Sequence, residues 1–204
     1  MRIIVVIPAY NEEQRITQAI VDASSFCDQV VVIDDCSTDN TATVARTAGA
    51  HVLHHLINRG QGASIQTATD YALKYLNPTV IVHFDADGQM MGHEIPSMVA
   101  PILDGSADIV LGSRFLGKSS NLPFSRWITL KLALLFTVVM SGIKVTDTHN
   151  GFRALSVKAA QEIRITLDRM AHASQILDQI KARRLRFTER PVTIRYTAET
   201  LAKG

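Results

Sequence analysis

The sequence predicts a single α/β domain of three layers, in which helices cover both faces of a mainly parallel central sheet. Apolar, largely β-branched segments at 2–7, 29–33 and 80–84 are typical of strands that are buried on both faces. Helical periodicity follows the first two segments, and strands that alternate with helices form parallel sheets. With 204 residues, 47% hydrophobic and 20% charged, the chain is long enough for one globular domain with its own core.

Breaking and capping residues define the first two strand–helix units. Pro8 ends the first strand, and Asn11 is expected to cap a helix whose apolar positions recur through residues 16–23. The second strand ends in the polar segment 34–41, which is rich in turn-forming residues. This segment is expected to cap a helix that begins near Thr41.

The later units bring polar side chains to one edge of the sheet. A short third strand at 52–53 leads into a glycine-rich loop at 58–63 and a helix that extends to about Leu76. The carboxyl ends of parallel strands share one edge, where ligands of α/β sheets bind. The residues expected at this edge are Pro8, Asp34, Asp35, Asp85 and Asp87.

Composition excludes several classes of protein. The net charge is +2, from 21 basic and 19 acidic residues, so the charge gives no reason to expect nucleic-acid binding. Cys27 and Cys36 have no Cys-x-x-Cys or Cys/His spacing, and we expect reduced thiols in the cytoplasm. The longest apolar run, 128–143, is interrupted by polar residues and is shorter than the roughly 20 residues of a spanning helix.

Two carboxylates, one residue apart, follow the strand at 80–84. Because alternate side chains of a strand share a face, Asp85 and Asp87 are expected to point the same way. Such oxygens suit Mg²⁺ or Mn²⁺, although turn formation or helix capping is another interpretation. The segment 8–12 after the first strand contains no glycine, so binding of a nicotinamide nucleotide is not indicated. The Asp-x-Asp-Gly pattern leaves a phosphatase with an aspartyl nucleophile as a minor alternative.

Six segments with distinctive polar, glycine or aromatic residues lie along the chain at 6–13, 32–41, 58–63, 84–89, 112–115 and 147–153. In these segments the sequence resembles the family 2 glycosyltransferases of GT-A fold, specifically the dolichyl- or polyprenyl-phosphate sugar transferases. The resemblance implies one Rossmann-like GT-A domain over 1–204, with a nucleotide-binding part at about 1–115 and an acceptor- and membrane-facing part at about 116–204. It also implies that the protein transfers a hexose from GDP-mannose or a UDP-sugar and inverts the anomeric carbon.

The same resemblance implies where the donor binds. The residues expected to bind the nucleotide sugar are Pro8, Tyr10, Glu12, Asp34, Asp35, Arg59 and Asp85. Among them, Glu12 is expected to accept hydrogen bonds from the ribose and Asp34 from a base N–H. Asp85, Asp87 and Gln89 are the implied ligands of Mg²⁺ or Mn²⁺, which neutralises the charge of the leaving diphosphate.

The nature of the acceptor determines which catalytic residues are needed. A lipid monophosphate has a second pKa near about 6, so at neutral pH it is mostly a dianion and needs positive charge rather than a general base. For this acceptor the resemblance implies Arg114, Arg126 and Arg153 as phosphate ligands. The catalytic residues expected are Asp87, Arg114, Arg153 and Gln175.

Gln175 departs from the pattern of the resembling family, which usually has an acid at or near this position. A neutral amide cannot be the general base that a carbohydrate hydroxyl requires. We therefore expect polyprenyl or dolichyl phosphate as the acceptor. Transfer to a carbohydrate hydroxyl, and a non-catalytic subunit that binds nucleotide sugars, are the alternatives.

The segment 122–143 bears on membrane binding. Trp127 and the many aliphatic residues around it are typical of either a core helix or a helix in the membrane interface, and the resemblance favours the second. Four arginines between 184 and 195 add a basic surface, and Pro191 predicts that the strand there is an edge strand. We expect a peripheral protein at the cytoplasmic face of the membrane, held there by an anchor that was removed or by a small partner protein.

Overall fold

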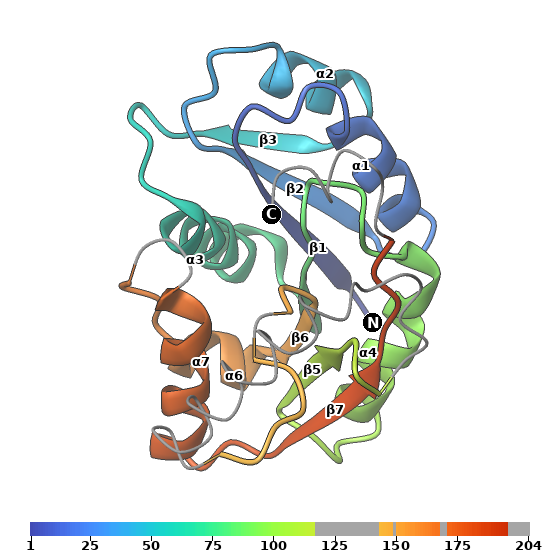
Figure 1. Ribbon diagram of the computed structural model, residues 1–204, viewed down its shortest axis with the longest axis vertical. Helices are drawn as coiled ribbons and strands as arrows, with labels where there is room; N and C mark the ends of the chain where they lie inside the picture. The colour runs from blue at the N-terminus through green and yellow to red at the C-terminus, as the bar shows by residue number, and fades with distance from the viewer. Residues whose placement is uncertain (117–142, 149, 168–170, 196–204) are drawn as a thin grey trace, which may run out of the picture.

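A computed structural model describes residues 1–116, 143–148, 150–167 and 171–195 and shows one α/β domain (Figure 1). In these residues seven strands form one sheet, in the order β3-β2-β1-β4-β6-β5-β7. The strands are β1 (Ile3–Ala9), β2 (Gln29–Asp34), β3 (His51–His54), β4 (Val80–His83), β5 (Ile109–Ser113), β6 (Arg153–Ser156) and β7 (Phe187–Pro191). Within this sheet β6 alone runs antiparallel to its neighbours, which confirms the predicted mainly parallel sheet.

Helices cover both faces of the sheet, so the predicted three layers are confirmed (Figure 1). One face carries α1 (Ile16–Ser24), α2 (Thr41–Thr47) and α4 (Ile95–Leu103), and the other carries α3 (Gln61–Tyr71), α6 (Val157–Glu162) and α7 (Ala171–Ala182). Val5 and Ile7 of β1 join the core on the first face, whereas Ile4 and Val6 join the core on the second. Because β1 is buried on both faces, all seven of its residues are buried and its sequence is apolar throughout.

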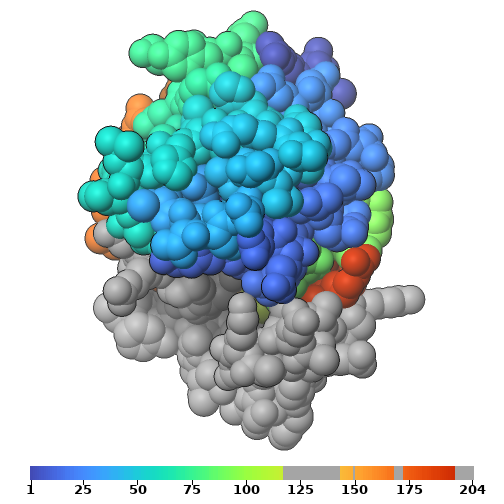
Figure 2. Space-filling view, turned by 90° about the horizontal axis from the view of Figure 1, so that it is seen from above, coloured from blue at the N-terminus to red at the C-terminus, as the bar shows by residue number. Residues whose placement is uncertain are grey.

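The register of the strands determines where the connecting segments meet. Ala9 of β1 lies level with Asp34 of β2, and Val6 lies level with His83 of β4. The segments that follow these three strands therefore begin at the same edge of the sheet. Figure 2, seen from above, shows blue and cyan residues of the N-terminal half side by side on this face of the molecule.

Most of the predicted boundaries agree with the structure. β3 includes the predicted third strand, and α2 begins at Thr41 as predicted. α3 continues as a π-helical turn, η1 (Ala72–Leu76), to the predicted end of that helix. A 3₁₀ turn, η2 (Gly92–Glu94), precedes α4. β7 is an edge strand that ends at Pro191, as the proline predicted.

The prediction that Asn11 caps the first helix is wrong. α1 begins at Ile16, and Arg15 is its N-cap. Asn11 instead has a φ of +54°, and its Oδ1 accepts the backbone N–H of Thr38 at 2.9 Å. Asparagine tolerates this left-handed conformation because its short amide can bond to nearby backbone. The capping signal was outweighed by a bond that joins the segments after β1 and β2.

The expectation that strand alternation aligns Asp85 and Asp87 is also wrong, because β4 ends at His83. Both carboxylates lie in the loop that follows. The loop is held by a bond from the backbone N–H of Gln89 to Asp87 Oδ1 at 3.0 Å, and by the contact of the Asp85 N–H with Met90 Sδ at 3.3 Å. Turn geometry, not the strand period, orients the two side chains.

An ion pair between a buried aspartate and an exposed arginine joins β5 to β7 and gives a first prediction. Asp108, before β5, is 5% exposed and accepts the backbone N–H of Arg186 at 2.9 Å and its Nη2 at 3.0 Å. Hydrogen bonds from Arg186 hold the pKa of the Asp108 carboxyl below its usual range. Asp108→Asn is expected to lower the free energy of unfolding at pH 7 by about 1 kcal/mol, a modest value because solvent screens the exposed guanidinium.

The pH dependence of this effect has a defined sign. A carboxyl whose pKa is lower in the folded state stabilises the fold above its usual pKa of about 4, and this contribution is lost as the pH falls through the folded-state value. The free energy of unfolding, measured with denaturant, should therefore differ between wild type and Asp108→Asn at pH 7, and this difference should become smaller below about pH 4. Asp178→Asn, at an exposed position on α7, is the matched control and should leave the stability unchanged. A difference that stays constant down to pH 2 would contradict the assignment.

Candidate active site

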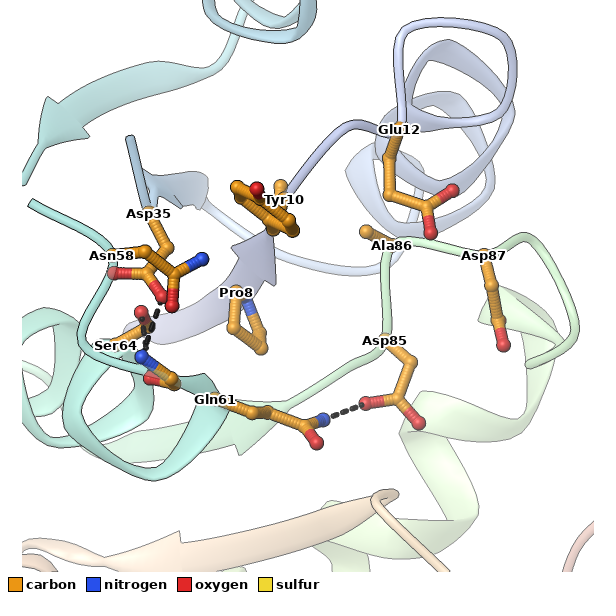
Figure 3. A pocket seen from close by; sticks show the side chains of 12 residues that line it. Pro8, Tyr10, Glu12, Asp35, Asn58, Gln61, Ser64, Asp85, Ala86 and Asp87 are labelled. Atoms are coloured by element: carbon orange, nitrogen blue, oxygen red, sulfur yellow. Dashed lines mark hydrogen bonds between the residues drawn. The ribbon is translucent and has the colours of Figure 1, made fainter. Parts of the chain in front are cut away.

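A pocket of about 530 Å³ opens at the carboxyl ends of β1 and β4 and the adjoining end of β2 (Figure 3). Its lining residues come from four separate segments of the chain. They are Pro8, Ala9, Tyr10, Glu12, Asp35, Asn58, Gly60, Gln61, Ser64, Asp85, Ala86 and Asp87. Figure 3 shows Asp35, Asn58 and Ser64 on one side of the pocket and the two acidic residues Asp85 and Asp87 on the other.

The glycine-rich loop forms one wall of the pocket, and Asp35 fixes its backbone. The carboxylate of Asp35 accepts the N–H of Arg59 at 2.9 Å and the N–H of Gly60 at 2.7 Å. Gly60 has a φ of +85°, a conformation that residues with a Cβ rarely adopt, and α3 starts directly after it. Gly62, in the first turn of α3, has no room for a Cβ, which would lie 2.4 Å from the backbone oxygen of Leu167. This close approach brings the loop after α6 against α3.

The loop after β4 supplies two carboxylates to the opposite wall. Gln61 Nε2 donates a hydrogen bond to Asp85 Oδ1 at 3.1 Å, so a side chain of α3 reaches across to this loop. Burial, and to a smaller extent the negative charge of Asp87, raises the pKa of Asp85 to about 7. Burial also raises the pKa of Asp87. The raised pKa values indicate two acids that are partly withdrawn from water and close enough to repel each other.

Two arginines lie behind the acidic loop. Arg153, at the start of β6, is 4% exposed, and its Nη1 has no hydrogen-bond partner among the described residues. Its charge favours the ionised form of Asp85, and the carboxylate of Asp147 is a second negative charge near its guanidinium. Arg114 donates its Nε–H to Asp147 Oδ2 at 2.7 Å. The site is therefore a cluster of alternating charge.

Hydrogen bonds at the end of β5 attach this cluster to the sheet. The Ser113 hydroxyl lies 2.6 Å from Thr146 Oγ1. Glu189 of β7 accepts the N–H of Thr146 at 2.8 Å and its hydroxyl at 2.9 Å. Residues from three distant segments thus place Asp147, and with it Arg114, next to the pocket.

The acidic loop fits a divalent cation whose coordination is completed by a substrate. In the described part of the chain, no group of three or more His, Cys, Asp or Glu side chains is placed to hold a metal ion. Asp85 and Asp87 provide two carboxylates, and their mutual repulsion would be relieved by a shared cation. Mg²⁺ typically binds one or two carboxylates together with water and substrate phosphates. The donor set therefore suits a metal that arrives with a phosphorylated ligand.

Comparison with known proteins gives the family. The family model described as glycosyl transferase family 2 matches residues 4–164, which include the whole pocket. The chain is a family 2 glycosyltransferase. The resemblance stated from the six sequence segments is thereby confirmed, and the minor alternative of a phosphatase is wrong.

Two relatives and one solved structure show the range of similar proteins. The glycosyltransferase is 30% identical to the undecaprenyl-phosphate mannosyltransferase of Micrococcus luteus, over 95% of this chain and 83% of that protein. It is 28% identical to the UDP-N-acetylglucosamine–dolichyl-phosphate N-acetylglucosaminyltransferase of Methanococcus voltae, over 99% of this chain and 89% of that one. The structure of glucosyl-3-phosphoglycerate synthase from Mycobacterium tuberculosis, in complex with Mn²⁺, UDP and phosphoglyceric acid, matches with a TM-score of 0.75 at 18% identity, over 98% of this chain and 73% of that chain. This similarity confirms the GT-A fold.

Most residues predicted to bind the nucleotide sugar lie together in the transferase. Those that line the pocket are Pro8, Tyr10, Glu12, Asp35 and Asp85, and the predicted metal ligand Asp87 lies there too.

Three of the predicted residues do not line the pocket. Asp34 is buried outside the pocket lining, with His54 Nδ1 2.6 Å from its Oδ2. Arg59 is exposed and borders a neighbouring cleft, so its backbone rather than its side chain belongs to the site. Gln89 is not among the lining residues.

Some of the residues predicted to bind the acceptor or to catalyse transfer lie near the acidic loop, and others do not. Arg114 and Arg153 lie beside the acidic loop, as described above. Arg126 lies outside the described residues. Gln175 is engaged elsewhere, because its Oε1 accepts the N–H of Thr166 at 2.9 Å and its Nε2 donates to the Thr166 hydroxyl at 2.7 Å. In this structure the amide of Gln175 stabilises the loop before α7.

Sequence reasoning missed several residues of the site. Gln61 was read only as part of the glycine-rich loop, although it directly follows Gly60 and could have been considered as a polar group at the start of a helix. Asn58, the first residue of the same loop, and Ser64, which follows it, also line the pocket. Asp147 begins the segment 147–153 but had no predicted role, and its bond to Arg114 spans 33 positions.

Proposed function

We propose that this glycosyltransferase moves a hexose, from GDP-mannose or a UDP-sugar, to the phosphate of a polyprenol or dolichol, with inversion at the anomeric carbon. One observation carries the proposal: two carboxylates line a pocket of about 530 Å³, and two arginines behind them lie close enough for their charges to act on Asp85. The two relatives described above are named for transfer to dolichyl or undecaprenyl phosphate, which supports the choice of acceptor.

The two walls of the pocket bind different parts of the donor. The wall of Asp35, Asn58 and Gly60 offers acceptors and backbone groups for the nucleoside, and Glu12 offers a carboxylate to the ribose. Asp85 and Asp87 would hold Mg²⁺ or Mn²⁺. When bound, the cation stabilises the negative charge of the leaving nucleoside diphosphate.

The arginines suit an acceptor that brings its own negative charge. A lipid phosphate dianion needs no proton removed, so the task of the protein is to position it for in-line attack. Arg153 is buried and Arg114 is nearly so, and a desolvated guanidinium binds phosphate strongly. Transfer to a carbohydrate hydroxyl requires a general base, and Gln175 cannot act as one.

We also propose that the protein works at the cytoplasmic membrane face, because its acceptor is a lipid. No helix in the described part of the chain is long and apolar enough to cross a membrane. The predicted interfacial helix at 122–143 lies almost entirely outside that part, as do Arg126 and Trp127.

Sugar transfer to a lipid phosphate tests the proposal. Nucleotide release is measured with GDP-mannose, UDP-glucose or UDP-N-acetylglucosamine, with Mn²⁺, and with either a short-chain polyprenyl phosphate or a soluble oligosaccharide. We expect release with one donor that requires the lipid phosphate and stops when EDTA removes the metal. Release that requires the oligosaccharide instead would favour the hydroxyl acceptor. Nucleotide binding without turnover on any acceptor would refute catalysis by this chain alone.

A further inference from the structure

A buried histidine lies behind the wall of the pocket that holds the glycine-rich loop. His55, one residue after β3, is 7% exposed. Its Nδ1 lies 2.7 Å from Asp35 Oδ1, and its Nε2 lies 3.0 Å from the hydroxyl of Thr67 on α3. An ionised carboxylate only accepts hydrogen bonds, so Nδ1 carries the proton. His55 thus joins Asp35 to the helix that follows the glycine-rich loop.

Asp35 is the point at which this chain of bonds reaches the pocket. Its Oδ1 accepts both the His55 ring N–H and the Arg59 backbone N–H, and its Oδ2 accepts the Gly60 backbone N–H. The ring N–H therefore sets the rotation of the carboxylate, which in turn sets the backbone of the glycine-rich loop. A side chain held by a second residue in this way is preorganised, so less ordering remains to be done when a ligand binds.

We propose that His55 is a positioning residue for the nucleoside end of the donor pocket, and that it acts through Asp35 without touching the donor. The inference rests on the proposed function, because it assumes that the pocket binds a nucleotide. It assigns to His55 an effect on donor affinity rather than on the transfer step, since the residue lies away from the acidic loop and the arginines.

The adjacent residue shows that this arrangement is specific. His54 also pairs with an aspartate, since its Nδ1 lies 2.6 Å from Asp34 Oδ2. However, its side chain is 45% exposed, and Asp34 does not line the pocket. Two consecutive histidines thus pair with two consecutive aspartates, and in this pair of contacts only the buried one is connected to the glycine-rich loop.

Three substitutions at one position separate the bond from the bulk of the ring. His55→Asn keeps an amide N–H near the position of Nδ1 and can still donate to Asp35. His55→Gln places its amide farther out, near the position of Nε2, and His55→Leu removes both bonds while filling the space. His51→Leu is the matched control, because this histidine lies on β3, is exposed and stacks on Tyr71 at 5.0 Å, away from the pocket.

Binding of UDP and GDP with Mn²⁺ is measured by calorimetry, together with KM for the donor and kcat. We expect His55→Leu and His55→Gln to raise the dissociation constant and KM about 10-fold with kcat nearly unchanged. His55→Asn should stay within about twofold of wild type, as should His51→Leu. If His55→Leu does not fold, Thr67→Val, which removes only the Nε2 contact, should raise the dissociation constant about threefold.

Each outcome has a distinct meaning. Equal losses in His55→Asn and His55→Leu, or a fall in kcat with KM unchanged, would show a merely structural or a catalytic role and would overturn the inference. If wild type binds the nucleotide and no substitution at position 55 changes the dissociation constant, the inference is overturned as well, while the proposed function stands. If wild type binds neither UDP nor GDP, the proposed function fails and the inference fails with it.

Discussion

Replacing Asp87 with alanine should lower the rate of sugar transfer by at least about 100-fold, because the cation would lose one of its two carboxylates. Asp87 lines the pocket, and its negative charge helps to raise the pKa of Asp85, so the two acids are close enough to share an ion. With only one carboxylate left, the leaving diphosphate would be neutralised poorly. The measurement is the initial rate of nucleotide release over a titration of Mn²⁺.

The effect should be specific to the metal. In Asp87→Ala, Mn²⁺ should no longer strengthen the binding of the nucleoside diphosphate, whereas the metal-free binding should change little. Asp178→Ala, an exposed acid on α7, is the matched control and should keep the wild-type rate. An unchanged rate in Asp87→Ala, or an unchanged dependence on Mn²⁺, would contradict the assignment of Asp87 to the metal.

The fold was predictable because its signals are local. Strands such as β1 are apolar throughout, and burial on both faces requires that composition. The alternation of strands and helices predicted the mainly parallel sheet, and the polar segment before Thr41 predicted the start of α2. Pro8 did not end the first strand as predicted, because β1 continues through it to Ala9. The start of α1 was not predictable in this way, since Asn11 is held by a backbone group of Thr38, which is 27 positions away.

The choice between Asp34 and Asp35 shows a limit of reasoning from one sequence. Adjacent residues at a strand end point to opposite sides, and a difference of one position decides which side chain faces the ligand. The prediction gave the base contact to Asp34 and named Asp35 only among the residues that bind the nucleotide sugar. In the structure Asp35 lines the pocket, whereas Asp34 is buried beside His54.

Pairing between distant residues was the other source of error. Gln61 reaches Asp85 across 24 positions, and Gln175 bonds to Thr166 on the preceding loop. Motif spacing identifies which segments approach the ligand, but it does not say which side chains are already committed to each other. Resemblance to a family supplied the segments, and the hydrogen bonds of the fold then assigned the side chains within them.

Gly151→Ala should disable the acidic loop without unfolding the protein. A Cβ at this position would lie 2.5 Å from Asp85 Oδ2 and 2.7 Å from Asp85 Oδ1, so the carboxylate or the backbone must move. The backbone is held, because Asn150 Oδ1 accepts the Phe152 N–H at 2.9 Å, and the buried Phe152 packs edge to face on Phe84 at 5.4 Å. The carboxylate should therefore give way.

A displacement of about 1 Å at a reacting group can cost roughly 100-fold in rate, and we expect a loss of this size in Gly151→Ala. Its denaturant midpoint should remain close to that of wild type. Gly105→Ala is the converse control, because Gly105 has a φ of +77° and open space around its Cβ position. The strained alanine should cost about 1 kcal/mol of stability while the rate of transfer is unchanged. If Gly151→Ala kept its activity, the Asp85 carboxylate could not be a ligand whose position limits the reaction.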